Sequence, residues 1–259
     1  MKHTYMQSFS ALGGIALFGF LGMVTQAPGN PQAILKLTPE EKEILGHMSI
    51  VYLDDGFGNM VNKTIRIEGV NVQIVNGTGT TEGSSNGLGN LIVGYNELGN
   101  PNGDNRTGSH NYVGGVRNTY SSHGGLVCGD MNTISGPMAA VTGGVRNTAS
   151  GPVSAVCAGD SNDACGDRTW VGGGIWNTAS GGGSTVCGGI LNLASGGQTW
   201  IGGGESNQAT GERSSVAGGR LNVAIGFGSS ISGGLNRTSP IAAVNTDYDW
   251  IGGSLWEDN

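Results

Sequence analysis

An asparagine recurs about every fifteen residues through the second half of this chain. The steps between successive members are 14, 15, 15, 15, 15, 15, 15 and 14 residues. The series is Asn118, Asn132, Asn147, Asn162, Asn177, Asn192, Asn207, Asn222 and Asn236. A short fixed period held over this many copies is typical of a solenoid, in which each coil buries its apolar face only by stacking on its neighbours.

Other positions of the repeat are as regular as the asparagine. A β-branched residue stands six positions before it, Ala two after it and Gly four after it, as in Val186, Ala194 and Gly196 around Asn192. Val and Ile favour strands, and fifteen residues suffice for two short strands and two tight turns. We expect Gly to supply the positive φ of the turns. We also expect the stacked Asn side chains to form hydrogen bonds along their column. The sequence predicts an all-β parallel β-solenoid of about ten coils, on the order of 50 Å long.

The composition argues against several other classes of protein. Gly accounts for 51 of 259 residues, but the triplet period of collagen is absent. Charged residues make up 12% and the net charge is −7, without the basic stripe of a nucleic-acid-binding protein. The four His residues are scattered and no Cys-x-x-Cys occurs. We therefore expect no metal, no cofactor and no nucleic-acid partner.

The N-terminus has the pattern of a signal peptide over residues 1–27. A positively charged start precedes an apolar run at residues 11–24, and residues 25–27 resemble a cleavage site. The run is short for a membrane-spanning helix. We expect a secreted or cell-surface protein with no membrane span after signal removal, and an uncleaved N-terminal anchor is the alternative.

The cysteines are Cys128, Cys157, Cys165 and Cys187. Cys157 and Cys187 share one repeat position two coils apart, roughly 9–10 Å by the strand spacing. A disulfide requires Cα atoms about 4.4–6.8 Å apart. An intrachain bridge between them is therefore disfavoured, and an interchain bridge is the alternative.

The segments before the repeats have a different pattern. Residues 28–47 predict a linker and a short helix, with Thr38 as N-cap and Glu41 completing a capping box. Residues 48–87 predict an N-terminal β region and loop: a hairpin, followed by a third strand at residues 70–75.

Residues 88–246 are assigned to the β-roll repeats, beginning with a degenerate coil around Leu91 and Asn96. The extra residues within 99–106 predict a protruding loop. Residues 247–259 break the period and are aromatic and acidic, which predicts a C-terminal cap over the last coil.

The repeats resemble the head repeats of trimeric autotransporter adhesins, the YadA-like left-handed β-roll. Their pattern S-V-x-G-G-x-x-N-x-A-S-G is nearly intact from Ser215 to Ala224, and the resemblance covers about residues 88–240. It implies a left-handed β-roll, a homotrimer and attachment to cell or matrix surfaces. The chain carries no C-terminal coiled coil or membrane anchor of that family, so we expect a released or otherwise attached fibre.

Apolar residues just before the Asn give an independent reason to expect self-association, since a lone rod would expose them. They are Val116, Met131, Val145, Ile175, Trp176, Ile190, Leu191 and Leu221. For ligand or interface contact the candidates are Trp170, Trp200 and Trp250. The first two share a column, where they would stack on sugars or protein; the alternative is that they cover the coil edge or fill the trimer interface.

Four functions remain open. The leading one is a secreted or surface fibre, adhesin-like or structural, that binds a surface glycan or protein; a receptor-binding fibre tip of a phage or injection device shares the fold. An ice-binding solenoid would use the Thr residues after the Asn, but Asp163, Leu193, Gln208 and Val223 interrupt that array.

A polysaccharide-active enzyme is the fourth alternative. It would need two converging carboxyls. The available groups are Asp54 with Asp55, Asp160 with Asp163 and Asp167, and Asp247 with Asp249. Because Asp in turns more often shapes the turn, we expect a non-enzymatic protein.

Overall fold

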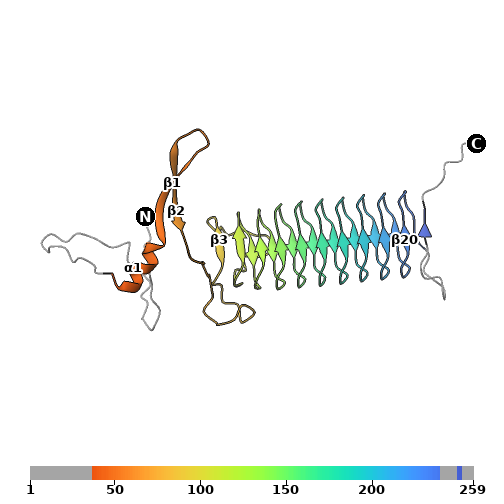
Figure 1. Cartoon of the computed structure of the whole chain (residues 1–259). Helices are drawn as coiled ribbons and strands as arrows, with labels where there is room; N and C mark the ends of the chain where they lie inside the picture. The colour runs from red at the N-terminus through yellow and green to blue at the C-terminus, as the bar shows by residue number, and fades with distance from the viewer. Residues whose placement is uncertain (1–36, 240–249, 253–259) are drawn as a thin grey trace, which may run out of the picture. The chain divides into compact units, whose positions relative to one another are not determined.

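The computed structural model describes residues 37–239 and 250–252 (Figure 1). The chain divides into two compact units, Met1–Asn71 and Val72–Asn259. The signal peptide predicted at residues 1–27 lies outside the described residues, as does most of the predicted C-terminal cap.

The first unit contains one helix and one hairpin. Helix α1 (Pro39–Gly46) begins with the predicted capping box: Thr38 Oγ1 accepts from the Glu41 amide at 3.2 Å, and Glu41 accepts from the Thr38 amide at 2.7 Å. Strands β1 (Met48–Asp54) and β2 (Met60–Ile67) are antiparallel. The helix buries no residue, and both strands expose most of their apolar side chains. A two-stranded hairpin without a core is marginal alone.

The third strand predicted at residues 70–75 is wrong. This segment forms no strand, although Val70, Val72 and Ile74 alternate with polar residues. The alternation leads to a strand only when the segment pairs with another strand, and here the sheet of the first unit contains β1 and β2 alone.

The second unit is a parallel β-solenoid, seen in Figure 1 as a row of stacked coils. One face is an eleven-stranded sheet: β3 (Leu91–Val93), β4 (Tyr112–Gly114), β6 (Leu126–Val127), β8 (Ala140–Val141), β10 (Ala155–Val156), β12 (Trp170–Val171), β14 (Thr185–Val186), β16 (Trp200–Ile201), β18 (Ser215–Val216), β20 (Ser230–Ile231) and β21 (Trp250–Ile251). The other is an eight-stranded sheet: β5 (Thr119–Tyr120), β7 (Thr133–Ile134), β9 (Thr148–Ala149), β11 (Asp163–Ala164), β13 (Thr178–Ala179), β15 (Leu193–Ala194), β17 (Gln208–Ala209) and β19 (Val223–Ala224).

The fold class is confirmed as an all-β parallel β-solenoid with a short N-terminal helix and hairpin. The coil number is about eight rather than the predicted ten. Within the described residues, only the coils from β4–β5 to β18–β19 carry a strand on both sheets. At the two ends, β3, β20 and β21 extend the eleven-stranded sheet alone.

The core is a double column of small side chains. Val or Ile from the eleven-stranded sheet faces Ala from the other sheet, and both columns have essentially no exposed area from Val141 to Ile231. In the first coils Tyr120 and Ile134 take the Ala position. Gly125 makes room there, because a Cβ at Gly125 would stand 2.6 Å from Ile134 Cδ1. The predicted Val and Ala positions are thus the buried ones.

The asparagine ladder is also confirmed from Asn118 to Asn222, all buried. The Asn192 side chain donates to Gly188 O, Gly204 O and Asn177 Oδ1, each at 3.0 Å, and its own Oδ1 accepts from the Asn207 amide at 2.9 Å. One side chain therefore satisfies backbone groups on its own coil and on the next one, and it bonds the Asn177 side chain on the preceding coil.

The last member of the predicted series, Asn236, does not join the ladder. The Asn222 Oδ1 accepts instead from the amide of Arg237 at 2.9 Å, so the final step is fifteen residues rather than fourteen. Asn236 lies one position earlier, exposed and with φ of +54°. Asn tolerates this left-handed corner, and Asn96 occupies the same kind of corner with φ of +53°.

One glycine column supplies the predicted positive φ and another does not. The Gly three positions before the Asn is left-handed in each coil, with φ of +92° at Gly189 and +90° at Gly204. Gly residues four positions after the Asn, such as Gly181 and Gly196, do not have positive φ. They allow close backbone approach: a Cβ at Gly181 would stand 1.9 Å from Gly196 O in the next coil. Non-glycine residues are left-handed at two further positions of the repeat, one directly before each ladder Asn and, in most coils, one six residues after it.

The predicted protruding loop at residues 99–106 is wrong as well. Asn100 is 5% exposed and donates to the carbonyls of Arg117 and Asn132 at 3.0 and 3.1 Å. The Asn105 carbonyl accepts from the Tyr120 amide at 2.9 Å. The loop thus covers β5, which would otherwise be the open edge of the eight-stranded sheet.

Candidate functional site

The first candidate surface is the corner formed by the two residues before each ladder Asn. The residue two positions before the Asn forms isolated parallel β-bridges with its equivalents on the adjacent coils, from Val116 to Leu235. The residue directly before the Asn has a left-handed backbone in every coil. This corner runs along one side of the solenoid and holds the apolar residues that the sequence marked as exposed.

Four large apolar side chains gather on two adjacent coils of this corner. Ile175, Trp176, Ile190 and Leu191, here called the corner patch, are 42%, 60%, 44% and 54% exposed. Ile175 and Ile190 are bridge partners on neighbouring coils. Trp176 and Leu191 have φ of +58° and +57°, a conformation that bulky residues rarely adopt. The chain thus combines solvent exposure with backbone strain at this patch.

Ion pairs lie on the same corner on both sides of the patch. Towards the N-terminus, Arg146 Nη2 stands 2.6 Å from Asp160 Oδ2; towards the C-terminus, Arg220 Nε stands 3.3 Å from Glu205 Oε2. Exposed pairs of this kind add little stability. They give the apolar patch a polar rim, the arrangement usual at protein–protein interfaces.

The second candidate surface is the outer face of the eleven-stranded sheet. Strand pairing places Trp170, Thr185, Trp200, Ser215, Ser230 and Trp250 in one row, here called the tryptophan column. Trp170 is 37%, Trp200 42% and Trp250 71% exposed. The structure therefore brings the three predicted tryptophans together and separates them from the corner patch.

The carboxylates of the enzyme alternative are dispersed among the described residues. Asp160 belongs to the corner ion pair, Asp163 lies on the eight-stranded sheet, and Asp167 stands 3.4 Å from Arg168 at another corner. Asp247 and Asp249 lie outside the described residues. The two hairpin carboxylates shape the turn: Asp54 accepts from the Gly56 amide at 2.7 Å and Asp55 from the Phe57 amide at 2.8 Å.

Asp163 has an unusual environment for a surface position. Burial raises the pKa of this carboxyl, while the neighbouring Cys165 thiol acts in the opposite direction. Its Oδ1 has no hydrogen-bond partner. Burial, followed by the charge of Asp163, also raises the pKa of Cys165. Such a thiol is a poor nucleophile, because the reactive form is the thiolate.

All four cysteines are free. Val156 and Val186, the residues before Cys157 and Cys187, both pair with Val171 from opposite sides. The two cysteines therefore lie on the coils before and after Gly172. This agrees with the two-coil separation expected from the repeat. Cys165 and Cys187 are exposed, and Cys128 and Cys157 are half-buried.

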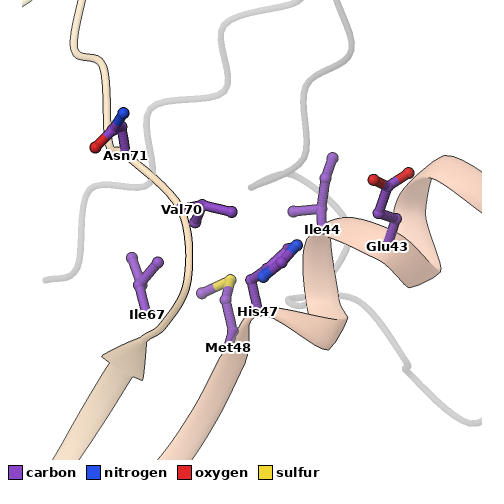
Figure 2. A pocket seen from close by; sticks show the side chains of 7 residues that line it. All are labelled: Glu43, Ile44, His47, Met48, Ile67, Val70 and Asn71. Atoms are coloured by element: carbon purple, nitrogen blue, oxygen red, sulfur yellow. The ribbon is translucent and has the colours of Figure 1, made fainter.

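A hollow in the first unit was not foreseen from the sequence. It has a volume of about 390 Å³ and lies between the end of α1 and the residues after β2. Figure 2 shows its lining side chains: Glu43, Ile44, His47, Met48, Ile67, Val70 and Asn71. The His47 ring is held by the Glu68 carbonyl, 2.9 Å from Nδ1. The hollow is mainly an apolar surface that this small unit leaves open.

Within residues 37–239 and 250–252, no helix is long and apolar enough to cross a membrane. In the same part of the chain, no three His, Cys, Asp or Glu side chains lie close enough to bind a metal ion. The chain matches no model of a known protein family and no curated protein sequence.

Proposed function

We propose that this protein is a secreted or cell-surface fibre, adhesin-like or structural, whose chains associate as a homotrimer through the corner patch. The observation that carries the proposal is the presence of Trp176 and Leu191 at strained, exposed positions. In a solitary rod, Ser or Asn at these positions would remove the apolar exposure, and Asn would also reduce the strain. Ser161 and Ser206 occupy the equivalent positions of the adjacent coils. A contact with another copy of the chain would bury these large apolar side chains.

The first unit supports association independently. Its helix has no buried residue and its hairpin exposes Ile50, Tyr52, Met60 and Ile65 by 49–63%. A segment of this size is stable when other surfaces cover its apolar side chains. The left-handed β-roll resemblance and the signal-like N-terminus support the trimer and the extracellular location.

The solution mass of the full chain, measured by light scattering with and without reductant, tests the assembly. A trimer has three times the chain mass of 26.2 kDa. The double variant Trp176→Ser, Leu191→Ser is expected to dissociate it, since both substitutions copy residues of adjacent coils. A monomeric full chain would contradict the proposal.

A matched control lies on another corner. Met138 and Val153 are also exposed, apolar and left-handed on adjacent coils, with φ of +55° each. The double variant Met138→Gln, Val153→Gln is expected to keep the trimer mass, because Gln198 stands at the equivalent position in the same conformation. Equal dissociation by both pairs would show that the corner patch is not the specific interface.

A further inference from the structure

We infer that the tryptophan column binds a neutral, extended β-linked glycan along the axis of the solenoid. The inference rests on the proposed function, because it names the chemical class of ligand that the fibre would attach to. It uses a different surface from the proposed trimer contact.

Aromatic residues in the column occur only together with a glycine two residues later. The pairs are Tyr112 with Gly114, Trp170 with Gly172, Trp200 with Gly202 and Trp250 with Gly252. The other described strands of this sheet have a non-aromatic residue and no such glycine: Leu91 with Val93, Leu126 with Cys128, Ala140 with Thr142, Ala155 with Cys157, Thr185 with Cys187, Ser215 with Ala217, and Ser230 with Ser232. Other coils have Thr, Cys, Ala or Ser at this position, so the coil does not always need glycine there. Glycine occurs at this position in the strands that carry an aromatic ring.

The glycines leave room both for the next coil and for the indole rings. A Cβ at Gly172 or Gly202 would stand 2.4 Å from the backbone oxygen of Cys187 or Ala217. A Cβ at Gly172, Gly202 or Gly252 would stand 2.8, 2.8 or 2.7 Å from Cη2 of the tryptophan two residues earlier. Each ring therefore extends along its own strand and covers the glycine. Trp170 and Trp200 keep 37% and 42% of their surface exposed, so each presents an aromatic platform to solvent.

The residues between the platforms are hydroxylated and uncharged. Thr185, Ser215 and Ser230 separate the tryptophans, and Ser215 Oγ lies 3.0 Å from Ser230 Oγ. Among the described strands, this column contains no ionisable side chain from Leu126 to Trp250. The tryptophan column therefore suits an uncharged ligand that offers apolar faces together with hydroxyl groups. A neutral sugar has this chemistry.

The spacing favours an extended chain of sugars. Trp170 and Trp200 are separated by one intervening strand, so their rings repeat at about 9.6 Å. In an extended β-1,4-linked glycan every second sugar presents the same face, and this spacing is about the length of two sugar units. Trp250 lies three strands beyond Trp200, roughly 14 Å by the same strand spacing, and extends the track less regularly.

Titration of the full chain with cellohexaose, followed by calorimetry and tryptophan fluorescence, tests the inference. Trp170→Ser and Trp200→Ser are each expected to weaken binding about tenfold, the effect of losing one aromatic contact. Both substitutions copy the Ser of the same column at positions 215 and 230, and circular dichroism checks that the coil is intact. Phe57→Ser is the control, because Phe57 is an exposed aromatic residue in the hairpin turn, and it should leave binding unchanged.

Each outcome decides between the inference and its alternatives. Failure of the correctly assembled protein to bind cellohexaose overturns the inference without touching the trimer proposal. A fall in solution mass for Trp170→Ser shows that the column is a contact between copies and also overturns it. Equal binding of maltohexaose, whose α-linkages curve the chain, overturns the claim for an extended β-linked ligand. A monomeric protein that still binds cellohexaose through Trp170 and Trp200 supports the glycan track and contradicts only the trimer.

Discussion

Each buried Asn of the ladder connects its own coil with the next through its amide side chain, and in Asn162, Asn177 and Asn192 the side chain also bonds the preceding Asn. For Asn192 the partners are the Asn177 side chain on one side and Gly204 O and the Asn207 amide on the other. Removing the side chain leaves the Asn207 amide and the Gly188 carbonyl without these hydrogen bonds, and an unsatisfied buried group costs more than an average hydrogen bond contributes.

We predict that Asn192→Ser lowers the free energy of unfolding by about 2–4 kcal/mol, since a serine hydroxyl is too short to replace the amide contacts. Asn236→Ser is the matched control. Asn236 is exposed at the corner, outside the ladder, and its substitution should change stability by less than about 0.5 kcal/mol. Chemical denaturation of both variants checks the prediction; equal losses would contradict the assigned register.

Asp163 is predicted to destabilise the fold at neutral pH. Its pKa is raised from 3.8 by burial, so the folded state binds the proton more tightly than the unfolded state. The penalty is therefore absent below the unfolded pKa and grows as pH rises through the folded pKa. Asp163→Thr, which copies Thr148 and Thr178 of the adjacent strands, should stabilise the protein by about 1 kcal/mol at pH 7.

Denaturation of Asp163→Thr at several pH values measures this effect. The stabilisation should disappear as pH falls below 3.8, where the carboxyl is protonated in both states. Asp167→Thr is the control, because Asp167 is exposed beside Arg168. A stabilisation by Asp163→Thr that is independent of pH would contradict the electrostatic cause.

The strands of the solenoid are mostly two residues long, too short to be stable except by stacking. The distance between coils is set where backbone meets backbone, at the Gly column four residues after the Asn. There a Cβ at Gly181 would overlap the next coil, whereas a Cβ at Gly188 meets nothing within 4 Å.

We predict that Gly181→Ala lowers the free energy of unfolding by about 3 kcal/mol, the upper range for forcing atoms into a packed site. Gly188→Ala should change it by less than about 1 kcal/mol, since that position is open and does not have positive φ. Thermal and denaturant unfolding of the two variants compares them directly. Similar effects would show that chain flexibility, rather than contact between coils, explains the glycines.

At the scale of the whole molecule, the second unit is a one-dimensional stack in which each coil contacts its neighbours. The stability of such a protein is approximately the sum of its repeats and their interfaces. Register between coils, rather than the identity of any one coil, is therefore what the fold must preserve.

Deletion of residues 208–222, one full period, is expected to leave a folded solenoid with a modestly lower melting temperature, because Asn207 is then followed by Val223 as Asn222 was. Deletion of residues 208–218 places Gly219 after Asn207 and should abolish the cooperative transition. Circular dichroism melts of both proteins test this. Folding of the second deletion would contradict a register fixed by the buried columns.

The sequence by itself determined the repetitive part of this protein. The fifteen-residue period, the Asn ladder, and the buried Val and Ala columns were readable because each position has the same neighbours in every coil. Helix α1 was predicted from its capping box, since Thr38 and Glu41 interact locally. The same period placed Trp170 and Trp200 in one column, whereas Trp250 was assigned to that column only by the structure.

Only the tertiary structure decided what happens where the repetition ends. Asn236 takes the left-handed corner because the Arg237 amide, not its own, meets Asn222 Oδ1. The loop at residues 99–106 folds against the first coils because β5 would otherwise keep unpaired backbone groups. The exposed apolar residues of the corner patch were predicted from the sequence, but the left-handed backbone of Trp176 and Leu191 was not, since a residue pattern does not reveal φ. These features depend on which backbone and side-chain groups lack a partner, and only the packed tertiary structure determines which groups those are.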